Sequence, residues 1–261
     1  MNVFRRIFLA IPLIACAVLP VAAFNPPPGG DSTNAFFSPD LLGGNASVTG
    51  GPFAPALPGE LLVNPALSAA EQRITLDASY AAIMSAGDQS GFGHLANLGA
   101  LFPTRKGVFG ASFHLIRSPF DSLPLDTAGF IHGSAAKELT DRIYAGAGLL
   151  AAVGEGWGLS GEIGILYLAG DIGFLKDAKI GFSITGLGRT FTPDTWGLDG
   201  DDPTGYASAF TPHTGIAGTI VKKKDVKVGL SLDLSAPTVQ NFVLDAGFEA
   251  VIREKVTLRT G

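Results

Sequence analysis

Apolar and polar residues alternate along most of the chain after residue 74, which is the pattern of β-strands whose two faces differ in chemistry. The clearest run covers residues 226–234, where Val and Leu alternate with Lys, Gly, Ser and Asp. The run at residues 94–102 is blurred, and the run at residues 214–222 is weak. About ten runs predict strands: residues 74–80, 94–102, 109–115, 142–153, 157–169, 180–185, 214–222, 226–234, 244–252 and 256–261.

The connections between these runs are uneven in length. Residues 103–107, 222–225 and 253–255 are tight turns, whereas residues 119–141 and 190–212 are long. Within residues 119–141 the composition favours a short helix over residues 127–139. Outer-membrane barrels alternate short turns with longer loops. That alternation fails in the middle of the chain, which indicates a merged or missed strand.

The N-terminus has the features of a secretory signal. Arg5 and Arg6 precede an apolar run, and small residues lead up to Ala23, where we expect cleavage. A transmembrane anchor is disfavoured because the run is short and contains prolines. A lipoprotein signal ending at Cys16 is a further alternative, although the chain stays apolar beyond that residue. Cys16 is the only cysteine, so cleavage after Ala23 leaves no thiol or disulfide.

Residues 24–70 are rich in Pro and Gly but also carry apolar side chains that need burial. A disordered tail would not carry so many. We therefore expect an N-terminal plug, or hatch, inside a barrel formed by residues 71–261. The stretch Leu61–Tyr80 is the transition from plug to first strand.

Composition favours a membrane barrel over a soluble β-protein. Charged residues are 16% of the chain and Gly contributes 35 of 261 residues, while the net charge is −5. The polar face of the strands is mostly Gly, Ser and Thr, which suits a lumen packed against a plug. The predicted fold is all-β, an antiparallel transmembrane β-barrel located in the outer membrane. An acidic exported chain has no basic face for nucleic acid.

Several polar residues fall on the predicted inner face of the strands. Residues at such positions tune what passes through a barrel, or they hydrogen-bond the plug and one another. The lumen candidates are Asp77, Ser79, His114, Glu162, Thr185, Asp233, Asp245 and Glu249.

No catalytic or cofactor motif stands out, so we expect no enzyme activity, cofactor or metal site. The four histidines, His94, His114, His132 and His213, are scattered rather than spaced as metal ligands. An acidic cluster at Asp194, Asp199, Asp201 and Asp202 fails the EF-hand spacing and favours a solvated loop. Residues 222–224, all Lys, predict a turn at a membrane rim.

A family resemblance enters at Asn64-Pro65-Ala66. A signal peptide, an irregular segment and Asn-Pro-Ala shortly before the first strand resemble the outer-membrane long-chain fatty-acid transporters. Residues 37–44 are similar to spirochaete-type members of that clan, and residues 164–188 resemble its PorV-type barrels. The resemblance implies a fourteen-stranded barrel with an N-terminal hatch, anchored at Asn64, Pro65 and Ala66.

The resemblance also implies what such a barrel would bind. Fatty-acid transporters pass hydrophobic small molecules, whereas PorV-type relatives serve secretion and bind other proteins. A soluble exported β-protein is the third alternative.

Residues 256–261 are too short to cross a bilayer at ~9–11 residues per strand. This predicts a barrel that is incomplete at its C-terminus, with outer-membrane lipid as a partner.

Overall fold

The computed structural model describes residues 31–32, 38–41, 47–53, 56–84, 91–118, 127–154, 156–189, 205–206, 210–239, 242–253 and 256–260. These residues form an all-β protein built on one antiparallel sheet of eleven strands. In this part of the chain, no α-helix is long and apolar enough to cross a membrane.

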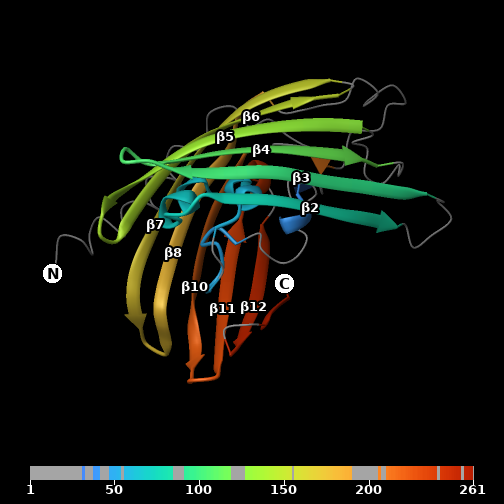
Figure 1. The fold of residues 1–261 in the computed structure, drawn as a ribbon. Coiled ribbons are helices and arrows are strands. Elements are labelled where there is room, and N and C mark those ends of the chain that lie inside the picture. Colours follow the sequence, from blue (N-terminus) through green and yellow to red (C-terminus); the bar gives the residue numbers. More distant parts are fainter. Residues whose placement is uncertain are drawn as a thin grey trace.

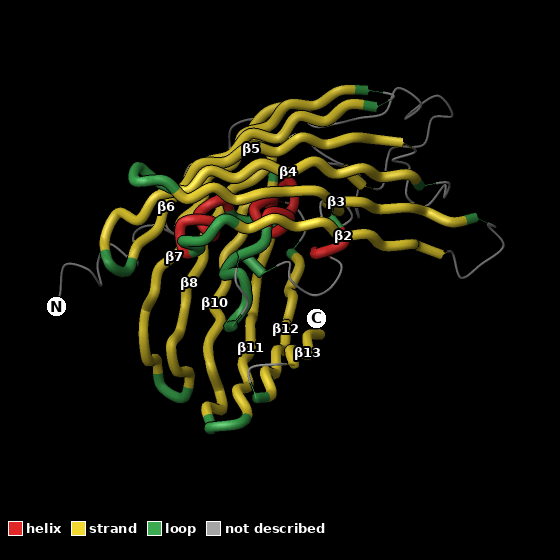
Figure 2. The backbone as a smooth tube through the Cα atoms, viewed as in Figure 1, coloured by secondary structure: helices red, strands yellow, loops and turns green. Residues whose placement is uncertain are grey.

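The strands of the main sheet follow one another in sequence order, from β2 at one edge to β13 at the other (Figures 1 and 2). A separate pair joins β1 (Asp31–Ser32) in parallel to β9 (Gly205–Tyr206). Three 3₁₀ helices are η3 (Pro58–Leu62), η4 (Pro65–Ala70) and η5 (Pro237–Val239). The sheet contains β2 (Thr75–Met84), β3 (Phe92–Pro103), β4 (Val108–Arg117), β5 (Thr127–Thr140), β6 (Ile143–Val153), β7 (Trp157–Ile172), β8 (Leu175–Arg189), β10 (Thr211–Lys222), β11 (Val226–Ser235), β12 (Val243–Ile252) and β13 (Val256–Thr260).

Strand β5 corrects the sequence prediction, because the helix expected over residues 127–139 is wrong. Phe130, His132 and Ser134 point to one side of the sheet, and Ile131 and Gly133 point to the other. This two-residue period belongs to a strand. The Ala-Ala-Lys-Glu-Leu sequence near its end favours a helix locally, but pairing with β4 and β6 decides the outcome. The missed strand raises the number from about ten to eleven.

With β5 in place, the connections sort into two sets at opposite ends of the strands. Five tight turns, at residues 104–107, 141–142, 173–174, 223–225 and 253–255, lie at what we call the turn end. The other connections, which include the long residues 190–210, join strands at the loop end. The alternation of short and long connections failed in the sequence prediction because β5 was missing from it.

The sheet curls strongly but is not closed into a barrel (Figures 1 and 2). Its edges, β2 and β13, each pair with one strand in the described part of the chain. β-Bulges interrupt the β7–β8 pairing, and Gly170 and Gly186 have φ values of 77° and 72°. Such bulges bend and twist a sheet. The predicted closed barrel is therefore seen only as an open, curved wall.

The two faces of the wall differ in polarity. Apolar side chains stand on the convex face, where the directly paired Leu98, Phe113 and Ile131 are 64%, 45% and 57% exposed. Within the described strands, charged side chains on this face occur only near strand ends, as at Arg117 and Lys137. The polar positions of the same strands face the concave side.

Residues 47–53 and 56–72, which we call the inner segment, lie within the curve of the sheet (Figure 2). Val48, Leu62 and Val63 pack with Leu95 and Phe130 in one buried cluster. A second cluster joins Leu61, Ala66 and Leu67 to strand residues such as Leu101 and Leu166. The hydrophobic core thus lies between the inner segment and the concave face.

Candidate functional site

Asn64-Pro65-Ala66 begins helix η4 through ordinary capping chemistry. The Asn64 side chain accepts a hydrogen bond from the Ala66 N–H at 3.0 Å, and Pro65 occupies the first helical position. Asn is a preferred N-cap residue, and proline fits the first turn because it has no N–H to satisfy. The tripeptide therefore starts a short, mostly buried 3₁₀ helix of six residues.

Asn64 also connects the inner segment to the sheet. Its Nδ2 donates to the carbonyl oxygens of Val48 at 2.7 Å and Ile165 at 3.3 Å. The first bond joins two parts of the inner segment, and the second reaches β7. Asn64 is fully buried, so every one of these bonds replaces water.

A track of glycines on the concave face makes room for the inner segment. Seven strands each contribute a glycine whose Cβ, if present, would overlap an inner-segment or neighbouring atom. Two pairs within the track, Gly146–Gly164 and Gly181–Gly215, are directly opposite in the ladder. The contacts are Gly99 with Pro58, Gly110 with Leu61, Gly146 with Pro65 and Ala66, Gly164 with Asn64, Gly181 and Gly215 with Val48, and Gly229 with Pro52.

Polar side chains on the C-terminal half of the sheet hold the inner-segment backbone. Asp233 Oδ1 accepts from the Val48 N–H at 2.9 Å, and Glu249 Oε2 accepts from the Phe53 N–H at 3.1 Å. The lumen candidates Asp233 and Glu249 therefore bind the inner segment itself. Glu249 also accepts from Arg259 Nε at 3.1 Å.

Two further side chains donate to the same backbone. Ser183 Oγ donates to the Val63 carbonyl at 2.6 Å, and Lys179 Nζ donates to the Gly51 carbonyl at 3.1 Å. Ser183 is fully buried. Strands β8, β11 and β12 thus each provide a polar contact to an otherwise irregular chain.

Glu60 in η3 is the most deeply buried carboxyl group of the inner segment. Its Oε2 accepts from the Leu57 N–H at 3.2 Å, whereas Oε1 has no hydrogen-bond partner among the described residues. The pKa of Glu60 is raised to about 8, mainly by burial and to a lesser extent by the charge of Asp40. The Leu57 hydrogen bond and the charges of Arg259 and Lys179 oppose this shift. A group with this pKa is neutral when the inner segment is seated near pH 7.

A second polar cluster lies at the β2 edge. Asn97 Nδ2 donates to Asp77 Oδ2 at 2.5 Å and to Asp40 Oδ2 at 3.1 Å, and it also reaches Ser79 Oγ at 3.4 Å. The predicted candidates Asp77 and Ser79 are thus brought together by Asn97. Asp40 adds a contact from the N-terminal segment.

Two buried histidines form polar pairs in the centre of the sheet. His132 Nε2 lies 2.9 Å from Glu162 Oε2, with both side chains almost fully buried. Gly148 leaves the space that this pair occupies. Ser112 Oγ lies 2.8 Å from His114 Nε2. The predicted candidates Glu162 and His114 therefore sit on the concave side but in separate pairs.

Of the remaining predicted residues, some lie in the part of the chain that the structure describes and others lie outside it. Thr185 is buried and lies near His213, whereas Asp245 is exposed and is paired opposite Asp233 on the concave side. Ala23, Cys16 and the acidic residues 194–202 lie outside the described residues. Among the described residues no group of three or more His, Cys, Asp or Glu could hold a metal ion.

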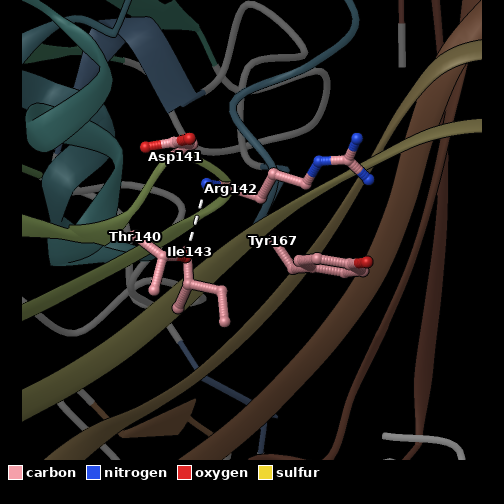
Figure 3. Close-up of a pocket in the computed structure, with 5 residues that line it drawn as sticks. All are labelled: Thr140, Asp141, Arg142, Ile143 and Tyr167. Carbon is pink, nitrogen blue, oxygen red and sulfur yellow. Dashed lines mark hydrogen bonds between the residues drawn. The ribbon is translucent and has the colours of Figure 1, made fainter. Parts of the chain in front are cut away.

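A pocket occurs at the β5–β6 hairpin (Figure 3). It is lined by Thr140, Asp141, Arg142, Ile143 and Tyr167. The Arg142 N–H donates to Thr140 Oγ1 at 3.4 Å and closes the turn. The hollow belongs to the turn end of the sheet and not to its concave face.

Sequence reasoning missed Glu60, Asn97, Ser183 and the glycine track. A glycine at the inward position of seven of the eleven strands could have predicted a close approach of another backbone. Glu60 gave no signal, because a lone acid in an irregular segment normally faces water.

Comparisons with protein-family models, curated proteins and solved structures find no match to this chain.

Proposed function

We propose that this chain forms the wall of an outer-membrane β-barrel of the fatty-acid-transporter type, which binds or passes hydrophobic small molecules such as long-chain fatty acids. The inner segment serves as its hatch. The observation that supports this most strongly is the reversal of polarity: apolar side chains are exposed on the convex face, and polar ones are buried beneath the inner segment. A water-soluble protein avoids so large an exposed apolar surface.

Strand length supports the same proposal. Apart from β13, the strands of the sheet have 10 to 16 residues. A tilted strand needs ~9–11 residues to cross the hydrocarbon core. Tight turns at one end and mostly longer connections at the other are also typical of outer-membrane barrels.

A second function, a structural or secretion-associated barrel that binds other proteins, is favoured by the filled concave face. Asn64 and Glu60 are fully buried there, and hydrogen bonds from several strands fix the inner segment. A lumen packed in this way provides support for the wall more readily than a passage.

The deciding experiment is membrane fractionation of the full chain, followed by extraction in non-ionic detergent and mass spectrometry of bound lipid. Retention of long-chain fatty acids supports the transporter proposal. A stable protein complex with no bound fatty acid favours the scaffold. Recovery of the folded chain in the detergent-free soluble fraction would overturn both.

A further inference from the structure

Charge is divided unequally between the two ends of the sheet. Four of the tight turns carry six exposed basic residues, which we call the basic rim: Arg105, Lys106, Arg142, Lys223, Lys224 and Arg253. The sequence of the same turns also contains the acids Asp141, Asp225 and Glu254. At the loop end, by contrast, residues 85–91, 118–126, 154–156, 190–210 and 236–242 contain no Lys or Arg.

This concentration is notable because the chain as a whole is acidic, with a net charge of −5. The nearby Lys176 and Lys222 are already neutralised by ion pairs with Asp171 and Asp177, at 2.8 and 2.6 Å. None of the six rim residues forms an ion pair with a described residue. Their charges are therefore available to an external anion.

The rim borders the apolar convex face directly. Phe102 and Phe109 flank the first turn and are each 48% exposed, and Phe174 at the β7–β8 turn is 71% exposed. A row of cations next to exposed aromatic and aliphatic side chains matches the boundary between lipid phosphates and acyl chains. Basic residues that only contact water would not be expected to lie beside exposed apolar side chains.

We propose that the basic rim binds the phosphate head groups of an anionic phospholipid leaflet and so fixes the turn end at that membrane surface. This inference rests on the proposed function, because it requires the convex face to lie in the bilayer. It adds an orientation: the acidic connections of the loop end point away from this leaflet.

The test uses the full chain, transferred from non-ionic detergent to vesicles and measured by flotation. Vesicles of phosphatidylcholine alone are compared with vesicles that also contain phosphatidylglycerol, at low and high NaCl. We expect phosphatidylglycerol to strengthen association by about tenfold or more at low salt, and high salt to remove the gain.

Matched double variants locate the effect. R105Q/K106Q and K223Q/K224Q each remove two rim charges and should lose most of the phosphatidylglycerol gain. R117Q/R189Q removes two charges at the loop end and should retain it. An equal loss in R117Q/R189Q would show that total charge, and not the rim, is responsible, and it would overturn the proposal.

The remaining outcomes separate the two levels of inference. Equal association with both vesicle types overturns the rim proposal and leaves the membrane wall intact. If the folded chain, verified by circular dichroism, associates with neither, the proposed function itself fails. Inorganic phosphate at matched ionic strength is the competitor, and specific inhibition by it would indicate a free-phosphate site instead.

Discussion

Position 164 has to be glycine because Asn64 leaves no space for a larger side chain. A Cβ at this position would overlap Asn64 Oδ1, which is fixed by hydrogen bonding to the Ala66 N–H. We expect Gly164→Ala to lower the free energy of unfolding by about 1–3 kcal/mol, as overpacking does in a filled core. Gly133→Ala is the control, because nothing lies within 4 Å of its Cβ position. Chemical denaturation in detergent measures both, and equal effects would contradict the glycine track.

Glu60 makes stability depend on pH. Burial raises its folded pKa from 4.5 to about 8, so the folded state holds a proton that the unfolded state releases. The stabilisation by the protonated form is complete below about pH 4.5 and is lost as pH rises toward 8. We expect a decline of a few kcal/mol across this range, and Glu60→Gln should abolish it.

Glu71→Gln is the matched control for this titration. A hydrogen bond from Arg73 lowers the pKa of Glu71, so Glu71 is ionised in the folded state and largely ionised in the unfolded state across pH 5–8. Denaturation midpoints measured across this range should keep their slope in Glu71→Gln. A slope that persists in Glu60→Gln would show that another group carries the titration.

At single positions, the sequence predicted which face of the sheet a side chain occupies where a polar side chain fell on the polar positions of an alternating strand. Asp233 in β11 and Glu249 in β12 are acids on strictly alternating strands, so their concave location could be predicted. Their actual partners, the N–H groups of Val48 and Phe53, could not be, because those contacts join residues far apart in the chain. Asn97 was missed because its strand has a blurred apolar pattern.

The inner segment is held in place mainly by its contacts with the strands of the sheet. The bond from Ser183 Oγ to the Val63 carbonyl is among the shortest of its contacts, at 2.6 Å. Ser183→Ala leaves that buried carbonyl without its serine donor, at a cost of about 1 kcal/mol. We expect amide hydrogen exchange in the inner segment to become about fivefold faster.

Ser231→Ala provides the comparison for Ser183→Ala. Ser231 is also buried on the concave face, but it makes no hydrogen bond to the described inner segment. Exchange in the inner segment should be unchanged in this variant. Equal acceleration in both would indicate a general loosening of the sheet.

Strand prediction succeeded where alternation was strict, as in β4 and β11, and failed at β5. There, small residues on both faces weaken the period, and only pairing with neighbours shows the strand. The 3₁₀ helices of the inner segment were likewise beyond the sequence, since packing against the sheet and not propensity stabilises them.

Across the whole molecule, the convex face should behave as a lipid-contacting surface. Phe113 lies on that face in the row formed with Leu98 and Ile131. Phe113→Lys should weaken association with phosphatidylcholine vesicles, because a lysine facing the bilayer midplane costs about 2–4 kcal/mol. Phe113→Leu keeps the surface apolar and should associate as the parent does. Unchanged flotation of Phe113→Lys would exclude this face from the bilayer.

The odd number of strands has a directional consequence. In an antiparallel sheet of eleven strands, the first and last run the same way, so β2 and β13 both point toward the loop end. If these two edges met, or if two copies in the same orientation met edge to edge, the pairing would be parallel. An all-antiparallel ring therefore requires an odd number of additional strands, and a single strand running toward the turn end is the smallest such complement.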